Sequence, residues 1–120
     1  GGDFFVDDLP RGADIVSMIR VAFDHPDERV LALLRAVRRA LPDDGTLLLA
    51  EPMAGAPGAA AMGDAYFGFY LLAMGRGRPR SASDFSALLR EAGFDGGRSV
   101  PTLLPLQTGI VVARCVARKP

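Results

Sequence analysis

The sequence predicts an α/β fold in which parallel strands are followed by a final antiparallel hairpin strand. Residues 14–23 form a nearly uninterrupted apolar run that is β-branched in part, as in a strand buried on both faces. Residues 30–41 place apolar side chains at helical spacing, and residues 46–50 form a second apolar run that ends at Glu51. A strand, a helix and a second strand in this order predict a right-handed parallel crossover.

The bulk composition is that of one ordinary globular domain. The chain has 120 residues, of which 49% are hydrophobic and 23% are charged. Fourteen basic residues balance fourteen acidic ones, so no overall field attracts nucleic acid. Cys115 is the single cysteine, which excludes an internal disulfide and favours a reducing compartment.

The sequence predicts neither a signal peptide nor a membrane span. We expect no signal peptide before the first strand, and the apolar stretches are far shorter than the roughly 20 residues of a membrane span. We therefore expect a cytoplasmic protein, with peripheral contact to the inner membrane as the alternative. Since the chain begins with Gly1 rather than Met, we expect it to be a piece of a longer protein.

The first elements each have a local explanation. Asp3 follows two glycines, so its carboxylate either accepts hydrogen bonds from a ligand or caps its own turn. Pro26 fits the opening turn of the helix, with His25 or Asp24 as its cap. Residues 42–45, Pro-Asp-Asp-Gly, end that helix and lead into the second strand.

The second half of the chain reads less clearly. Residues 52–63 are rich in Ala, Gly and Pro and predict a loop. Residues 64–74 predict a helix that is apolar on nearly all sides, which either packs in the core or lines an apolar cavity. Residues 75–80 predict a short basic loop exposed to solvent, with a phosphate contact as the alternative.

The chain then predicts one more helix and a closing hairpin. A helix over residues 84–92 should end at Gly93. Residues 94–100 predict a weak strand, and residues 109–116 predict the last strand, antiparallel to its neighbours.

Ionisable residues collect where the two parallel strands end. His25 lies in an acidic turn after the first strand, and Glu51 ends the second. The carboxyl ends of neighbouring parallel strands meet at one edge of a sheet, where open α/β sheets bind ligands. An imidazole beside a carboxylate can remove a proton from a hydroxyl. The alternative is that His25 only caps the helix. One His and one Cys leave no zinc site of the usual kind.

Short motifs stand at residues 2–5, 12–14, 20–28, 48–53, 62–81 and 91–94, and so cover essentially the whole chain. In their order and spacing they resemble the C-terminal half of the S-adenosylmethionine-dependent small-molecule O-methyltransferases. Within that family the downstream part looks most like the demethylspheroidene (hydroxyneurosporene) O-methyltransferases.

The resemblance implies a fold and a division of the chain. The fold would be the C-terminal half of a class I methyltransferase (Rossmann-like) sheet, formed by residues 1–120. The Gly-rich cofactor loop and the N-terminal dimerisation region of the family would be absent, so that this portion alone should not methylate a substrate. The full-length protein would be a homodimer.

The resemblance also implies roles for individual residues. Asp3 and Phe4 fall where the family contacts the adenine of S-adenosyl-L-methionine. Glu51 falls on the acidic residue that flanks the catalytic base. The family's Leu-His-Asp-Trp motif departs here: Phe23 takes the His position, Asp24 keeps the Asp, and His25 takes the Trp position. Either His25 acts as the base, oriented by Asp24 or Glu51, or the proton passes to Glu51 or water.

The implied activity is methyl transfer to a hydroxyl of a hydrophobic small molecule, expected to be a carotenoid tertiary alcohol. The alternatives are an aromatic polyketide or phenolic hydroxyl, and a non-catalytic remnant that serves as a binding or dimerisation module. A polyene substrate needs apolar walls more than hydrogen bonds. The residues expected to line its pocket are Phe23, Met62, Tyr66, Phe67, Phe69, Tyr70 and Met74.

Overall fold

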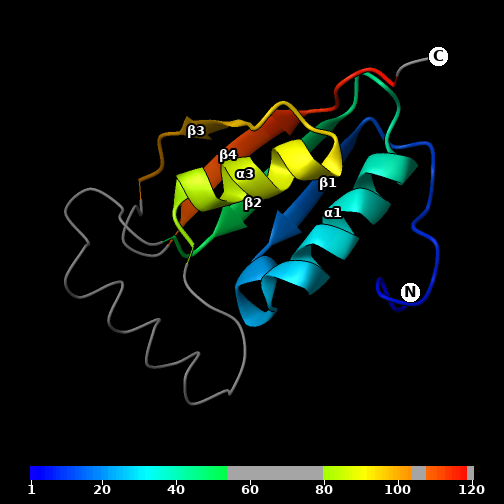
Figure 1. The fold of residues 1–120 in the computed structure, drawn as a ribbon, viewed down its shortest axis with the longest axis horizontal. Coiled ribbons are helices and arrows are strands. Elements are labelled where there is room, and N and C mark those ends of the chain that lie inside the picture. The colour runs from blue at the N-terminus through cyan, green and yellow to red at the C-terminus, as the bar shows by residue number, and fades with distance from the viewer. Residues whose placement is uncertain (54–79, 104–107, 119–120) are drawn as a thin grey trace.

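The computed structural model describes residues 1–53, 80–103 and 108–118. Within them a sheet has the strand order β1-β2-β4-β3, and helices α1 and α3 lie on one face of that sheet (Figure 1). Strands β1 (Ile15–Ile19) and β2 (Thr46–Glu51) are parallel. Strand β4 (Gly109–Arg114) is antiparallel to both β2 and β3 (Arg98–Val100). This arrangement confirms the predicted α/β class, including the antiparallel final hairpin strand.

Helix α1 (Asp27–Ala40) connects the two parallel strands. Its buried stripe consists of Val30, Leu33, Leu34 and Val37, which pack on the sheet. Acidic residues occupy its first turn and arginines its last turn, as the helix dipole favours. The predicted cap is wrong, because Pro26 is the N-cap residue and makes no side-chain capping bond.

Helix α3 (Ala82–Ala92) begins and ends with strong local caps. Ser81 and Asp84 form a reciprocal capping box, in which the Ser81 hydroxyl accepts from the Asp84 N–H at 3.1 Å. Gly93 ends the helix in the left-handed region at φ 101°, a conformation that disfavours side chains with a Cβ. The capped helix places Phe85 and Leu89 in the core.

The first strand is shorter and more exposed than the sequence predicts. β1 ends at Ile19, Arg20 adopts a positive φ of 55°, and residues Ala22–Asp24 form a 3₁₀ turn. Burial on both faces is also wrong, since Ile15 is 65% exposed and Ile19 61% exposed. The reason is that α1 and α3 cover one face of the sheet only.

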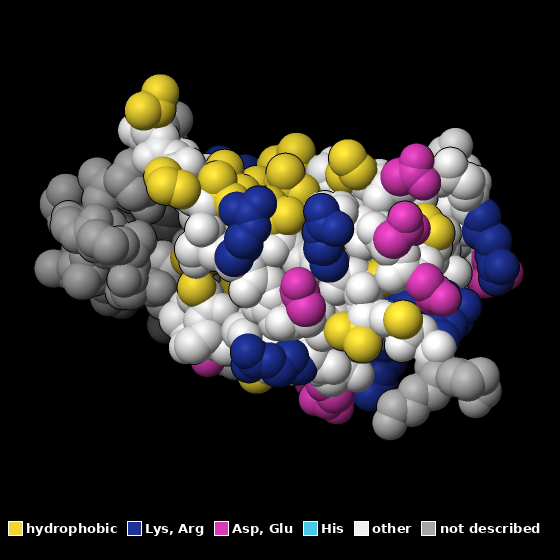
Figure 2. Space-filling view, turned by 90° about the horizontal axis from the view of Figure 1, so that it is seen from above, with side chains coloured by type: hydrophobic (Ala, Val, Ile, Leu, Met, Phe, Trp, Pro, Cys, Tyr) yellow, Lys and Arg dark blue, Asp and Glu magenta, His cyan; other side chains and the backbone are white. Residues whose placement is uncertain are grey.

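On the face in Figure 2, basic and acidic side chains are interspersed among the described residues. None of the described helices has the length and apolarity that crossing a bilayer requires.

Candidate active site

The loop that follows β1 is the centre of the candidate site. β1 and β2 run in parallel with Ile19 paired to Ala50, so the residues after each strand emerge at the same edge. The Arg20 N–H donates to the Ala50 carbonyl at 2.8 Å, which ties the start of the loop to β2. The structure therefore brings the His25 loop and Glu51 together at one edge of the sheet.

The Glu51 side chain binds backbone N–H groups of this loop. Its carboxylate is fully buried, and Oε1 accepts from the N–H groups of Val21 at 3.0 Å and Ala22 at 2.9 Å. Burial raises the pKa of the Glu51 carboxyl; hydrogen bonds from backbone N–H groups and the charge of Arg80 oppose that shift. The geometry makes Glu51 an anchor of the loop that carries His25.

His25 lies against the N-terminal segment of the chain. Its ring meets the Phe5 ring edge to face at a centroid distance of 5.0 Å, and the Phe4 ring at 6.3 Å. Phe5 is in turn covered by the Arg29 guanidinium, 4.2 Å from the ring centroid. The predicted base and the predicted cofactor-binding segment are thus in direct contact.

Asp3 lies in a turn in which its side chain and its backbone N–H both form hydrogen bonds. Oδ1 accepts from the Phe5 N–H at 2.9 Å, and the Asp3 N–H donates to Asp7 at 2.8 Å. The side chain thus does cap its own turn, as one of the two readings predicts. Asp3 is exposed and Phe4 is 36% exposed, so a carboxylate and an aromatic face remain accessible to a ligand.

The other predicted site residues are placed less favourably or lie outside the described residues. Asp24 is half-buried in the 3₁₀ turn. Phe23 is 6% exposed, with the Arg20 guanidinium 6.0 Å from its ring centroid. The remaining predicted pocket residues fall within 54–79, outside the described residues: Met62, Tyr66, Phe67, Phe69, Tyr70 and Met74.

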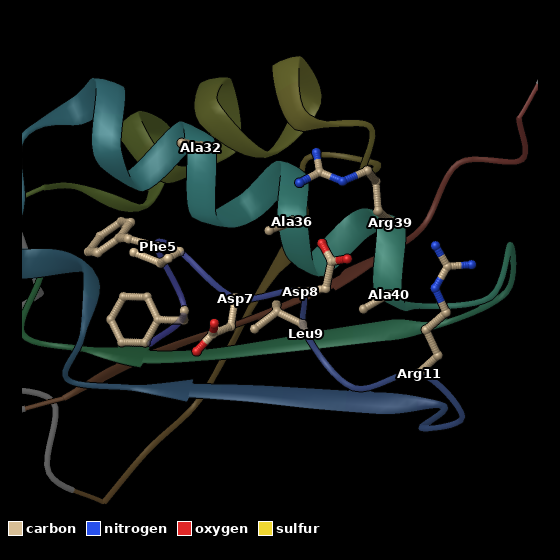
Figure 3. Close-up of a pocket in the computed structure, with 11 residues that line it drawn as sticks. Phe5, Asp7, Asp8, Leu9, Arg11, Ala32, Ala36, Arg39 and Ala40 are labelled. Carbon is tan, nitrogen blue, oxygen red and sulfur yellow. The ribbon is translucent and has the colours of Figure 1, made fainter. Parts of the chain in front are cut away.

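A cavity of about 210 Å³ lies between the N-terminal segment and α1 (Figure 3). Phe4 and Phe5 stand at its wall together with Asp7, Asp8 and Arg39, so it is more polar than a polyene pocket needs. Of the predicted site residues that the structure describes, Phe4 alone lines this cavity.

Sequence reasoning missed a second deeply buried charged group of the site, beside Glu51. Arg80 was predicted to lie in a solvent-exposed basic loop, but it is 1% exposed. Its Nη1 donates to the Ala22 carbonyl at 2.9 Å, and its Nη2 donates to the His25 carbonyl at 2.6 Å. The sequence places Arg80 directly before the Ser81 capping box, so that its position at the start of a helix can be predicted. Its burial cannot, because the acceptors of the Arg80 side chain are more than fifty residues away in the chain.

Comparison with known proteins assigns the family. A model of the O-methyltransferase domain matches residues 1–95. The chain is 41% identical to a demethylspheroidene O-methyltransferase of Rhodobacter capsulatus over 93% of its own length and 28% of that protein. A protein of the same name from Cereibacter sphaeroides is 44% identical over 94% of the chain and 30% of the relative.

Solved structures agree with this assignment. The crystal structure of LaPhzM superposes with a TM-score of 0.85 at 31% identity, over 97% of this chain and 34% of that one. CalO1 from calicheamicin biosynthesis, in its SAH-bound form, gives a TM-score of 0.80 at 27% identity, over 98% of this chain and 33% of that one. The chain thus spans about a third or less of the length of these relatives. It belongs to the O-methyltransferase family.

Proposed function

We propose that the complete protein transfers a methyl group from S-adenosyl-L-methionine to a hydroxyl of a hydrophobic small molecule, a carotenoid tertiary alcohol of the demethylspheroidene type. The observation that carries this proposal is the 41–44% identity to two demethylspheroidene O-methyltransferases over nearly the whole chain. The position of the His25 loop at the carboxyl ends of two parallel strands is consistent with it.

The residues of the N-terminal turn fit the nucleoside part of such a cofactor. The exposed Asp3 carboxylate can accept hydrogen bonds from an amine or hydroxyl, and the half-exposed Phe4 ring can pack on a base. When bound, the cofactor supplies a methyl group on a positively charged sulfur. Residues of this chain would hold only part of it.

We assign His25 to proton removal from the acceptor hydroxyl. With the cofactor bound, the acceptor oxygen would bond to the methyl carbon as the methyl–sulfur bond breaks and S-adenosylhomocysteine leaves, and the hydroxyl proton would pass to the His25 imidazole or to water. The Glu51 carboxylate fixes the loop by accepting hydrogen bonds from backbone N–H groups of the loop, and Asp24 directly precedes His25 in the chain. Correct alignment of donor and acceptor supplies much of the rate of such a displacement.

A phenolic acceptor is the second candidate. It is favoured by the likeness to a phenazine O-methyltransferase of Lysobacter antibioticus, 32% identical over 95% of the chain. Assaying the complete enzyme with a hydroxycarotenoid and with a phenolic polyketide, and measuring the methyl mass shift, separates the two. Methylation of the phenol alone would contradict the carotenoid assignment.

A non-catalytic binding module is the remaining alternative. Isothermal titration of S-adenosylhomocysteine against the complete protein tests it directly. We expect saturable binding, and absence of binding would contradict both enzyme assignments. We further expect a homodimer in the cytoplasm with peripheral contact to the membrane that contains a carotenoid, which sedimentation and vesicle flotation would test.

A further inference from the structure

Arg80 makes contacts that no solvent-exposed loop residue would make. It lies where the chain returns to the sheet, paired with Met53 in an isolated bridge and followed directly by the Ser81 cap of α3. Its side chain is fully buried. A buried guanidinium is costly unless its donors are satisfied, so its partners must explain why it is there.

Three of the Arg80 nitrogens point into the same short stretch of chain. Nη1 donates to the Ala22 carbonyl at 2.9 Å, Nη2 to the His25 carbonyl at 2.6 Å, and Nε to Asp27 Oδ1 at 2.8 Å. Nη2 also lies 2.8 Å from the same Asp27 oxygen. The acceptors therefore bracket residues 22–27, which include Phe23, Asp24 and His25.

Glu51 holds the start of the same loop. Its carboxylate accepts the N–H groups of Val21 and Ala22, while Arg80 donates to the carbonyls of Ala22 and His25. One buried anion thus binds the donors of the loop and one buried cation binds its acceptors. Glu51 accepts from backbone N–H groups, and Arg80 donates to two backbone carbonyls and to the Asp27 carboxylate, an arrangement that fixes the path of the loop.

We propose that Arg80 is a positioning residue for methyl transfer, which holds the loop of residues 22–25 so that His25 faces the acceptor hydroxyl. This inference rests on the proposed function. The planar guanidinium is required, because its donors point in several fixed directions, whereas a Lys ammonium is a single point charge.

Hydrogen exchange and kinetics on the complete enzyme test this role with three variants. Arg80→Met removes the donors, Arg80→Lys keeps the charge, and Arg98→Met is a control because Arg98 is exposed on β3. In Arg80→Met we expect the rate of hydrogen exchange at the amides of residues 21–25 to rise about tenfold or more, while the exchange rates of the sheet strands stay unchanged. We expect kcat to fall about thirtyfold while KM and the affinity for S-adenosylhomocysteine change less than about threefold.

The outcomes are distinguishable from failure of the proposed function. If the unmodified enzyme neither binds S-adenosylhomocysteine nor methylates, the proposed function is wrong. Unaltered amide exchange in Arg80→Met would separately refute the role of Arg80 in holding the loop of residues 22–25. Faster exchange with an unaltered kcat would reduce Arg80 to a purely structural residue and overturn the proposal. If Arg80→Met does not fold, Arg80→Lys decides: a kcat about tenfold lower at unchanged affinity supports the role, and an unchanged kcat refutes it.

Discussion

At the scale of single residues, His25 combines a chemical group with contacts that fix its place. Its ring packs edge to face on Phe5, and its loop is bound by Glu51 and Arg80. In the complete enzyme we expect His25→Ala to lower kcat about tenfold or more, since general base catalysis contributes at least that much. Glu28→Ala, an exposed change in the next turn, is the control. An unchanged rate in His25→Ala would remove the imidazole from the mechanism.

Glu51 predicts a dependence of stability on pH. Burial raises its pKa above the ordinary 4.5, so the folded protein binds this proton more tightly than the unfolded chain does. The unfolding free energy should therefore fall as pH rises from 4.5 through the pKa of the folded carboxyl. Glu51→Gln should flatten this slope in urea unfolding measured at several pH values. Glu91→Gln, whose side chain is 59% exposed, should leave it unchanged; an identical slope in both variants would contradict the assignment.

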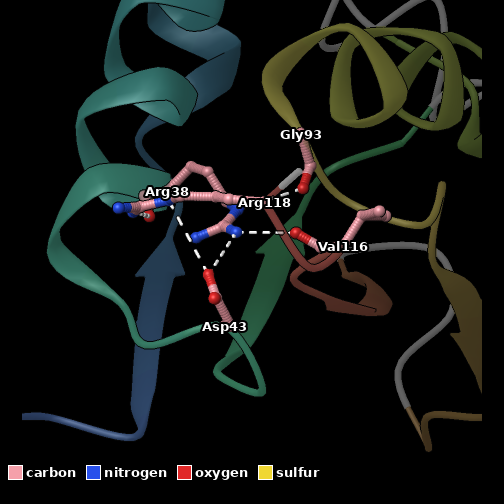
Figure 4. A network of polar contacts seen from close by, with 5 residues as sticks. All are labelled: Arg38, Asp43, Gly93, Val116 and Arg118. Atoms are coloured by element: carbon pink, nitrogen blue, oxygen red, sulfur yellow. Dashed lines mark hydrogen bonds and ion pairs between the residues drawn. The ribbon is translucent and has the colours of Figure 1, made fainter. Parts of the chain in front are cut away.

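At the scale of elements, Arg38 joins the end of α1 to two other segments (Figure 4). Nε donates to the Gly93 carbonyl at 3.1 Å, and Nη2 to the Val116 carbonyl at 2.6 Å and to Asp43 at 3.0 Å. We expect Arg38→Met to lower the unfolding free energy by about 2–4 kcal/mol, since two partly buried carbonyls lose a charged donor. Arg35→Met should cost less than about 1 kcal/mol, because that exposed residue has one weak ion pair at 3.4 Å. Equal losses would contradict the network's importance.

The sequence predicts some of the helices and strands but not all of their contacts. The helix stripe and the apolar strands are local periodic signals, so α1, β2 and the parallel pairing follow from them. The early end of β1 depends on a positive φ at Arg20, and the conformational preference of Arg does not predict a positive φ. Arg80 was missed because its acceptors come from residues 22–27, so its burial is a property of the tertiary fold.

At the scale of the whole molecule, neither of the described helices covers the second face of the sheet. The side chains of alternate residues in β1, β2 and β4 point away from α1 and α3, and register places Ile19, Ala50 and Ile110 in one row across the sheet. On β1 this face is open, with Ile15 65% and Ile19 61% exposed. Within the described residues β1 also pairs on one side only.

An apolar face next to an unpaired strand edge promotes association between chains. We therefore expect the 120-residue chain to self-associate as its concentration rises in sedimentation velocity experiments. Changing Ile15 and Ile19 together to Lys should abolish this association, because two charges on the edge strand oppose both face-to-face and edge-to-edge contact. Leu103→Lys removes an apolar side chain that is more exposed than Ile15 and Ile19 but lies away from β1, and it should leave the association intact. A chain that stays monomeric at all concentrations, or a Leu103 variant that alone prevents association, would show that the open face of β1 is not the contact.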